Sequence, residues 1–184
     1  MNFEEEMEKA PLTQAEEDRI FSAQVPLYEK AVLEMRNTSG LKERHSAIPQ
    51  AAKAAYMLGL FPEAKEWAEE MSELIKIVPK NWNYGNVIYY QNWVFGMLAF
   101  DSGDLDKAKY FLNLAASTVG SPQLNSFGPN MKLARNLLVS GESEAFLEFL
   151  NQVEIFWRHG KPWLEVWRNK VAQGAIPNCT MHIS

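Results

Sequence analysis

The side chains that most often carry out catalysis are few in this sequence and lie far apart. The histidines are His45, His159 and His182, and the single cysteine is Cys179. A metal site needs several such ligands together, and a nucleophile needs a base beside it. The chain also has no glycine-rich phosphate loop, no GxSxG elbow and no HExxH pair. We therefore expect no catalytic residue, no metal and no cofactor, with an enzyme built on helices as an alternative.

Carboxylates are numerous, but their spacing places them on the polar side of a helix. They flank an apolar stripe that includes Trp67, Met71 and Leu74, and they are Glu63, Glu66, Glu69, Glu70 and Glu73. An amphipathic helix at the surface carries its charges on the face opposite to the core. We therefore interpret this acidic group as a solvated face.

The charge distribution separates a short leader from the remaining chain. Residues 1–20 hold seven acids and two bases, and these account for the whole net charge of -5. We expect an acidic, flexible leader over 1–12 and a single helical-repeat domain over 13–184. The neutral body has no basic face for nucleic acid. The uncharged runs 81–100 and 110–131 contain asparagine, proline or glycine, so we expect no membrane span. One cysteine favours a reducing, cytoplasmic location.

Apolar residues recur at helical spacing along most of the chain and predict an all-α fold. A capping box formed by Thr13 and Glu16 begins a first helix near 13–37, which Pro26 would kink or split. Asp104 is a candidate N-cap. Three helix pairs are expected, at about 48–59 with 62–78, 86–101 with 104–118, and 129–140 with 142–158. A last helix is expected over about 162–173.

The segment GMLAFDSGDLDKAKYFLNLA resembles a tetratricopeptide repeat (TPR). Its small and apolar residues match the spacing of that repeat at Gly96, Ala99, Gly103, Asp104, Ala108, Leu112 and Ala115. An earlier unit matches at Ala52, Ala55, Gly59, Ala64 and Ala68, and a later one at Ala134, Leu137, Gly141, Phe146 and Leu150. The turn glycines are 44 and 38 residues apart, longer than the family period of about 34. The segment SPQLNSFGPNM resembles a segment of small bacterial TPR-like proteins of uncharacterised function.

The resemblance implies antiparallel helix pairs stacked as a short right-handed array, with units near 45–78, 86–118 and 129–158. It also implies a scaffold or adaptor that binds a peptide segment or a partner helix on its concave face. Secretion-type chaperones and self-association into a homodimer are alternatives. The first-helix positions that would line this face are Tyr90, Trp93, Met97 and Phe100, with Lys53 and Arg135 at its two ends. Packing of the same aromatic side chains in the core is the competing interpretation.

The stretch GSPQLNSFGPN at 120–130 separates the second and third pairs and contains no charge. Pro122 and Pro129 argue against a continuous helix, and Pro129 is suited to open the next one. As a connector, the stretch would tuck Leu124 and Phe127 into the core. As a binding loop, it would present Gln123, Asn125 and Phe127 to a ligand. Both interpretations stay open at this point.

Overall fold

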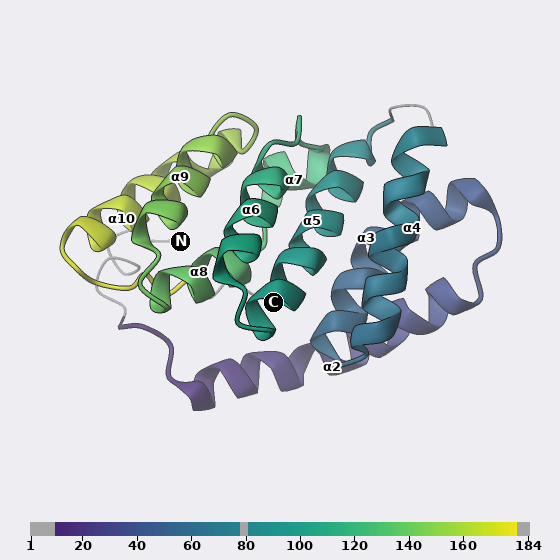
Figure 1. The fold of residues 1–184 in the computed structure, drawn as a ribbon, viewed down its shortest axis with the longest axis horizontal. Coiled ribbons are helices and arrows are strands. Elements are labelled where there is room, and N and C mark those ends of the chain that lie inside the picture. The colour runs from purple at the N-terminus through teal and green to yellow at the C-terminus, as the bar shows by residue number, and fades with distance from the viewer. Residues whose placement is uncertain (1–9, 78–80, 180–184) are drawn as a thin grey trace.

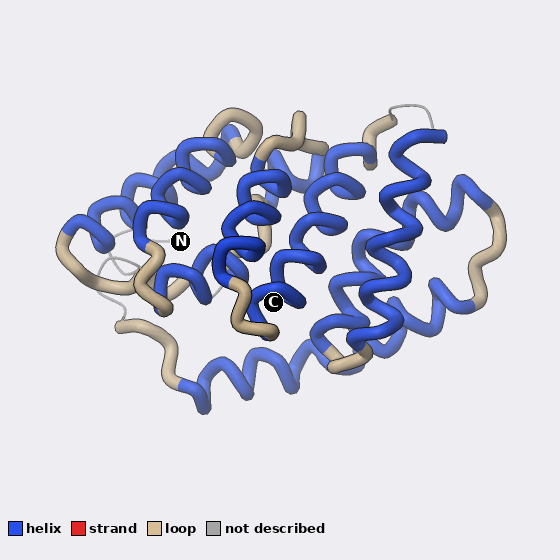
Figure 2. The backbone as a smooth tube through the Cα atoms, in the orientation of Figure 1, coloured by secondary structure: helices blue, strands red, loops and turns tan. Residues whose placement is uncertain are grey.

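The computed structural model describes residues 10–77 and 81–179 of the chain, and these residues form helices joined by turns (Figures 1 and 2). The described residues contain no strand. The all-α class predicted from apolar spacing is therefore confirmed for this part of the chain.

The first described helix, α2 (Gln14–Arg36), begins as its capping box predicts. The Thr13 hydroxyl accepts a hydrogen bond from the Glu16 amide, and the Glu16 carboxylate accepts one from the Thr13 amide at 2.8 Å. Pro26 lies in the middle of α2, yet the helix runs on to Arg36. Of the two expected effects of Pro26, a kink or a split, the split does not occur.

The following helices pack in adjacent pairs, each joined by a short turn. The pairs are α3 (Leu41–Met57) with α4 (Phe61–Ile77), α5 (Tyr84–Asp101) with α6 (Leu105–Ala116), and α8 (Lys132–Val139) with α9 (Ser143–Val153). In the middle turn Gly103 has a φ of 81°, and the Asp104 side chain accepts a hydrogen bond from the Lys107 amide. Both features follow from local turn chemistry, because a left-handed residue and an N-cap are what a tight turn between two helices needs.

The largest differences from the predicted helices lie at α3 and around residues 120–132. Helix α3 begins at Leu41, well before the predicted start at 48, and contains Pro49 in its interior. A short helix, α7 (Pro122–Phe127), occupies the stretch between the second and third pairs. Pro129 does not open the next helix, because α8 begins only at Lys132. After α9 the chain forms a 3-10 turn, η1 (Arg158–Gly160), and then α10 (Lys161–Ala172).

Helix α5 is the centre of the packed structure. It contacts α3 and α4 on one side and α6 and α8 on the other. Gly96 allows α5 to pack closely on α6 and α8. A Cβ atom at this position would lie 2.4 Å from Leu133 Cδ2 and 3.3 Å from Phe111 Cβ. A helix with neighbours on this many sides needs apolar residues around most of its circumference. Burial on several sides therefore explains why apolar residues cover most of α5.

Candidate functional site

The predicted groove on α5 is not open. Trp93 and Met97 are buried, with 0% and 1% of their surfaces exposed, and Phe100 is half-buried against the core. The Trp93 ring packs edge-on against Tyr56, with the ring centroids 5.3 Å apart. The prediction that Trp93 and Met97 face a partner was therefore wrong, and the competing core interpretation holds for both residues.

Helix α2 also contacts the basic residues at both ends of the predicted groove. The Arg135 guanidinium forms an ion pair with Glu17 at 2.6 Å, and the Lys53 ammonium lies 5.4 Å from the Tyr28 ring centroid. Both basic side chains thus contact α2, the long helix along the lower edge of Figure 1. Burial also lowers the pKa of Lys53 to about 8. The residues predicted to contact a ligand's ends contact this chain's own first helix instead.

A pocket of about 330 Å³ lies between α3, the start of α5 and α7. We call it the Asn86 pocket. Its lining residues come from three segments distant in sequence, and none of them carries a charge; they are Ser46, Pro49, Gln50, Trp82, Asn83, Asn86, Tyr90, Gln123, Leu124, Phe127 and Gly128. A site with apolar walls and a few placed polar groups is typical of ligand binding.

One wall of the Asn86 pocket depends on Pro49. Proline has no N–H, so within α3 it cannot bond to the carbonyl of His45 four residues earlier. The Asn83 side-chain amide donates to that carbonyl at 2.8 Å and lies 3.4 Å from the neighbouring Ser46 carbonyl. A side chain from α5 therefore satisfies the backbone group that Pro49 leaves open, which is why α3 continues through this residue.

From Asn83 a chain of side-chain amides, the amide chain, crosses to α7. The Asn86 Nδ2 group donates to Asn83 Oδ1 at 2.7 Å and to Gln123 Oε1 at 3.2 Å. The Asn86 Oδ1 atom accepts a hydrogen bond from the Ser121 hydroxyl at 2.7 Å. Asn83 and Asn86 are both buried, so the bond between them forms away from water, whereas the bonds to Gln123 and Ser121 are partly buried.

Helix α7 is anchored on both sides of the amide chain. Gly120, with a φ of 82°, packs so closely on Gly85 that a Cβ atom at Gly85 would lie 1.8 Å from the Gly120 carbonyl oxygen. On the other side, Asn125 Oδ1 accepts a hydrogen bond from the Arg158 amide at 3.1 Å. The stretch 120–130 is therefore an ordered connector, and it also forms one wall of the pocket.

Two exposed aromatic side chains line the mouth of the Asn86 pocket. Trp82 is 56% exposed and Phe127 is 75% exposed, although Phe127 was expected in the core as part of a connector. Leu124 is buried as that interpretation predicted. The half-buried Tyr90 also lines the pocket, and burial raises the pKa of its hydroxyl to about 12, so the hydroxyl keeps its proton at neutral pH.

Three of the predicted site residues line the Asn86 pocket: Tyr90, Gln123 and Phe127. Asn125 lies on the same short helix but lines a neighbouring depression and bonds to the Arg158 amide. Pro49, Asn83 and Asn86 were missed as site residues. Two features of the sequence could have indicated them: a proline inside a helical pattern, and the asparagine-rich run NWNYGN at 81–86.

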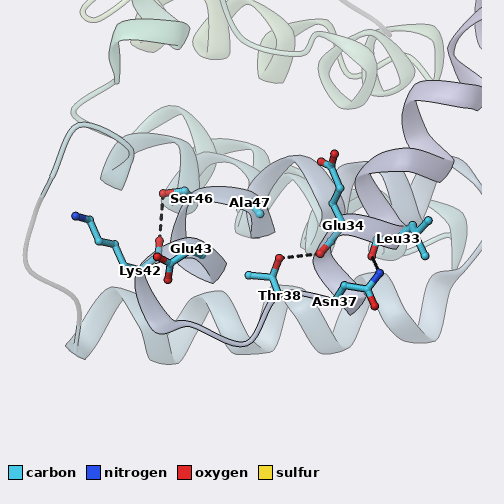
Figure 3. A pocket seen from close by; sticks show the side chains of 8 residues that line it. All are labelled: Leu33, Glu34, Asn37, Thr38, Lys42, Glu43, Ser46 and Ala47. Carbon is cyan, nitrogen blue, oxygen red and sulfur yellow. Dashed lines mark hydrogen bonds between the residues drawn. The ribbon is translucent and has the colours of Figure 1, made fainter.

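A larger cleft of about 790 Å³ lies between the end of α2 and the start of α3 (Figure 3). Several of its polar side chains bond to the backbone of their own helices or of the adjoining turn. Asn37 donates to the Leu33 carbonyl at 2.9 Å, and Thr38 donates to the Glu34 carbonyl at 2.7 Å. These groups serve to end α2, and the cleft differs from the uncharged Asn86 pocket in that Glu34, Lys42 and Glu43 line it.

Within the described residues no group of three or more histidine, cysteine, aspartate or glutamate side chains could hold a metal ion. His45 is buried, and this burial lowers its pKa. Across the same part of the chain, each helix is too short or too polar to cross a membrane. Comparisons with protein-family models, with curated proteins and with solved structures give no match.

Proposed function

We propose that this chain is a protein-interaction module, a scaffold or adaptor, that binds an uncharged segment of a partner protein in the Asn86 pocket. In this proposal the helix pairs stack as a short array of TPR type, and the ligand binds at an edge of the array. The observation that carries the proposal is the amide chain, which is held rigid between two exposed aromatic side chains.

The chemistry of the pocket suits a peptide. Side-chain amides form hydrogen bonds with peptide groups, and their fixed orientation reduces the entropy lost on binding. Trp82 and Phe127 offer large apolar surfaces that a ligand would remove from water. Aromatic side chains buried on association supply much of the binding free energy in protein interfaces.

The absence of charge among the lining residues narrows the class of ligand. An ionised side chain entering the pocket would lose hydration and gain no counter-charge from the residues that line it. A partner helix on the inner face of α5 is less favourable, because α2 contacts both Lys53 and Arg135 there. The pocket needs no such displacement of α2.

The proposal can be tested by selecting peptides from a random display library on the purified chain and measuring their affinities by calorimetry. We expect Trp82→Ala and Phe127→Ala each to weaken binding by about tenfold or more. Tyr110→Ala is the matched control, because Tyr110 is an exposed aromatic residue on α6 that does not line the pocket. Selection of no peptide, or of peptides that bind these variants unchanged, would refute the proposal.

A further inference from the structure

Another pocket, of about 450 Å³, lies between the first half of α2 and the turn that joins α3 to α4. We call it the aromatic pocket, because Phe21 of α2, Tyr56 of α3 and Phe61 of α4 all line it. It shares no lining residue with the Asn86 pocket. Its size falls in the range of small-molecule sites, and its walls come from helices that are distant in sequence.

The three rings of the aromatic pocket favour a cation that carries apolar groups. The Tyr56 and Phe61 rings lie with their centroids 5.4 Å apart and their planes at 45°. Phe61 is 44% exposed, and Phe21 is half-buried on α2. The face of an aromatic ring is electrically negative, so it attracts a positive charge while the same ring packs against alkyl groups.

Two carboxylates that line the same pocket lack a counter-charge. Asp101 Oδ2 accepts a hydrogen bond from the Tyr56 hydroxyl at 2.7 Å, which holds this carboxylate beside the Tyr56 side chain. Asp18 Oδ1 accepts one from the neutral Gln14 amide at 2.8 Å. Neither carboxylate forms an ion pair with a side chain in the described part of the protein. Their negative charges are therefore left for a ligand.

The remaining charges that line the aromatic pocket do not cancel these two carboxylates. Glu17 forms an ion pair with Arg135 at 2.6 Å, so its charge is balanced within the protein. Lys132 is the one basic residue that lines the pocket, and its ammonium pairs with no carboxylate among the described residues. Two unpaired carboxylates beside one ammonium leave a net negative charge. A neutral ligand gains nothing from this charge, whereas a cation is attracted by it.

We infer that the aromatic pocket binds a small organic cation, an ammonium group that carries alkyl substituents, with those substituents against the three rings and the charge beside Asp18 and Asp101. A quaternary ammonium suits such a site better than a primary one, because it has no N–H groups to satisfy and places its alkyl groups on aromatic surface. This is a second site, separate from the pocket of the proposed function.

The test compares three probes by nuclear magnetic resonance titration of the purified chain. Choline is the quaternary ammonium. The neutral alcohol in which a quaternary carbon replaces its nitrogen keeps the shape without the charge, and ethanolamine keeps the charge as a primary ammonium. We expect choline to bind at least about tenfold more tightly than the neutral alcohol, and more tightly than ethanolamine.

Variants of the pocket should change choline binding in opposite directions. Asp101→Asn and Phe61→Leu should each weaken it roughly threefold to tenfold, because they remove a negative charge and an aromatic face. Lys132→Met should strengthen it, because a like charge is removed. Asp106→Asn and Tyr110→Leu are the matched controls, since both residues are exposed on α6 and outside the pocket. Circular dichroism of each variant establishes that the helices are retained.

Several results would overturn the inference: equal affinity for the neutral alcohol, tighter binding of ethanolamine, or weaker binding in Lys132→Met. A short peptide carrying trimethyllysine distinguishes the two sources of such a group. Tighter binding of this peptide than of choline, with the same response to the variants, would keep the site and identify its ligand as a modified side chain. Binding of neither would overturn the inference. The proposed function would still stand, because display-selected peptides and Trp82→Ala test it at the other pocket.

Discussion

Asn83 donates a hydrogen bond to the His45 carbonyl, which Pro49 cannot bond, and the loss of this bond should have a measurable effect on stability. Asn83→Ala removes the donor to the buried His45 carbonyl at 2.8 Å and the acceptor for Asn86 at 2.7 Å. Leaving a buried polar group unpaired costs about 1–3 kcal/mol. The substitution affects two such groups, the His45 carbonyl and the Asn86 side-chain amide. We expect Asn83→Ala to lower the free energy of unfolding by about 3 kcal/mol in urea titrations followed by circular dichroism.

The decisive measurement is the same substitution in a Pro49→Ala background. Alanine supplies the backbone N–H that proline lacks, so α3 itself can then bond to the His45 carbonyl. One of the two unpaired groups is thereby rescued, and Asn83→Ala should cost at least about 1 kcal/mol less than it does in the wild type. Costs that are additive to within about 0.5 kcal/mol would refute the linkage between Pro49 and Asn83.

The second proline inside a helix provides the control for this cycle. Pro26 lies in the interior of α2, and Asn83 bonds to α3 and α5. Pro26→Ala and Asn83→Ala should therefore be additive. Coupling in this control pair would mean that proline substitutions act through the unfolded chain, and the coupling at Pro49 could not then be assigned to its carbonyl.

Three further predictions concern burial, ionisation and close packing. Trp93→Ala should cost about 3–5 kcal/mol in urea unfolding, whereas Trp82→Ala should cost less than about 0.5 kcal/mol, because Trp93 is buried and Trp82 is exposed; equal losses would contradict this assignment. Burial lowers the pKa of Lys53 from 10.5 to about 8, so the unfolded chain binds this proton more tightly and stability rises between these pH values. Lys53→Met should therefore remove this rise in stability between pH 8 and 10.5; a rise of unchanged size in the variant would count against the assignment. Gly85→Ala should cost about 3 kcal/mol by thermal unfolding, since its Cβ atom would lie 1.8 Å from the Gly120 carbonyl oxygen; an unchanged melting temperature would exclude this contact.

The features that could be predicted from the sequence are those that depend on residues close together in the chain. The capping box of α2 involves Thr13 and Glu16, and the middle turn needs only a left-handed glycine followed by the Asp104 cap. Burial of Trp93 is different, because its ring packs against Tyr56 on another helix, α3. The ion pair between Glu17 and Arg135 joins residues 118 positions apart, and no local pattern predicts it.

The start of α3 shows how a correct local rule can give a wrong boundary. Proline favours a helix start and disfavours a helix interior, so a helix beginning near 48 was the natural expectation for Pro49. The rule fails because Asn83 bonds to the carbonyl that proline leaves unpaired. The two residues are 34 positions apart, and the run NWNYGN gave no reason to pair its second asparagine with that proline.

The exposure of Phe127 follows from how firmly its helix is held. Helix α7 is attached at three points. Gln123 accepts a hydrogen bond from Asn86, the Ser121 hydroxyl donates to Asn86 Oδ1 at 2.7 Å, and Asn125 accepts from the Arg158 amide. With α7 held in this way, Leu124 is buried and Phe127 is 75% exposed. A large apolar side chain kept in solvent by ordered contacts on both sides is not a loosely packed core residue. Under the proposed function an incoming segment would bury it, which is why we propose that the ligand lies against this helix and not on the inner face of α5.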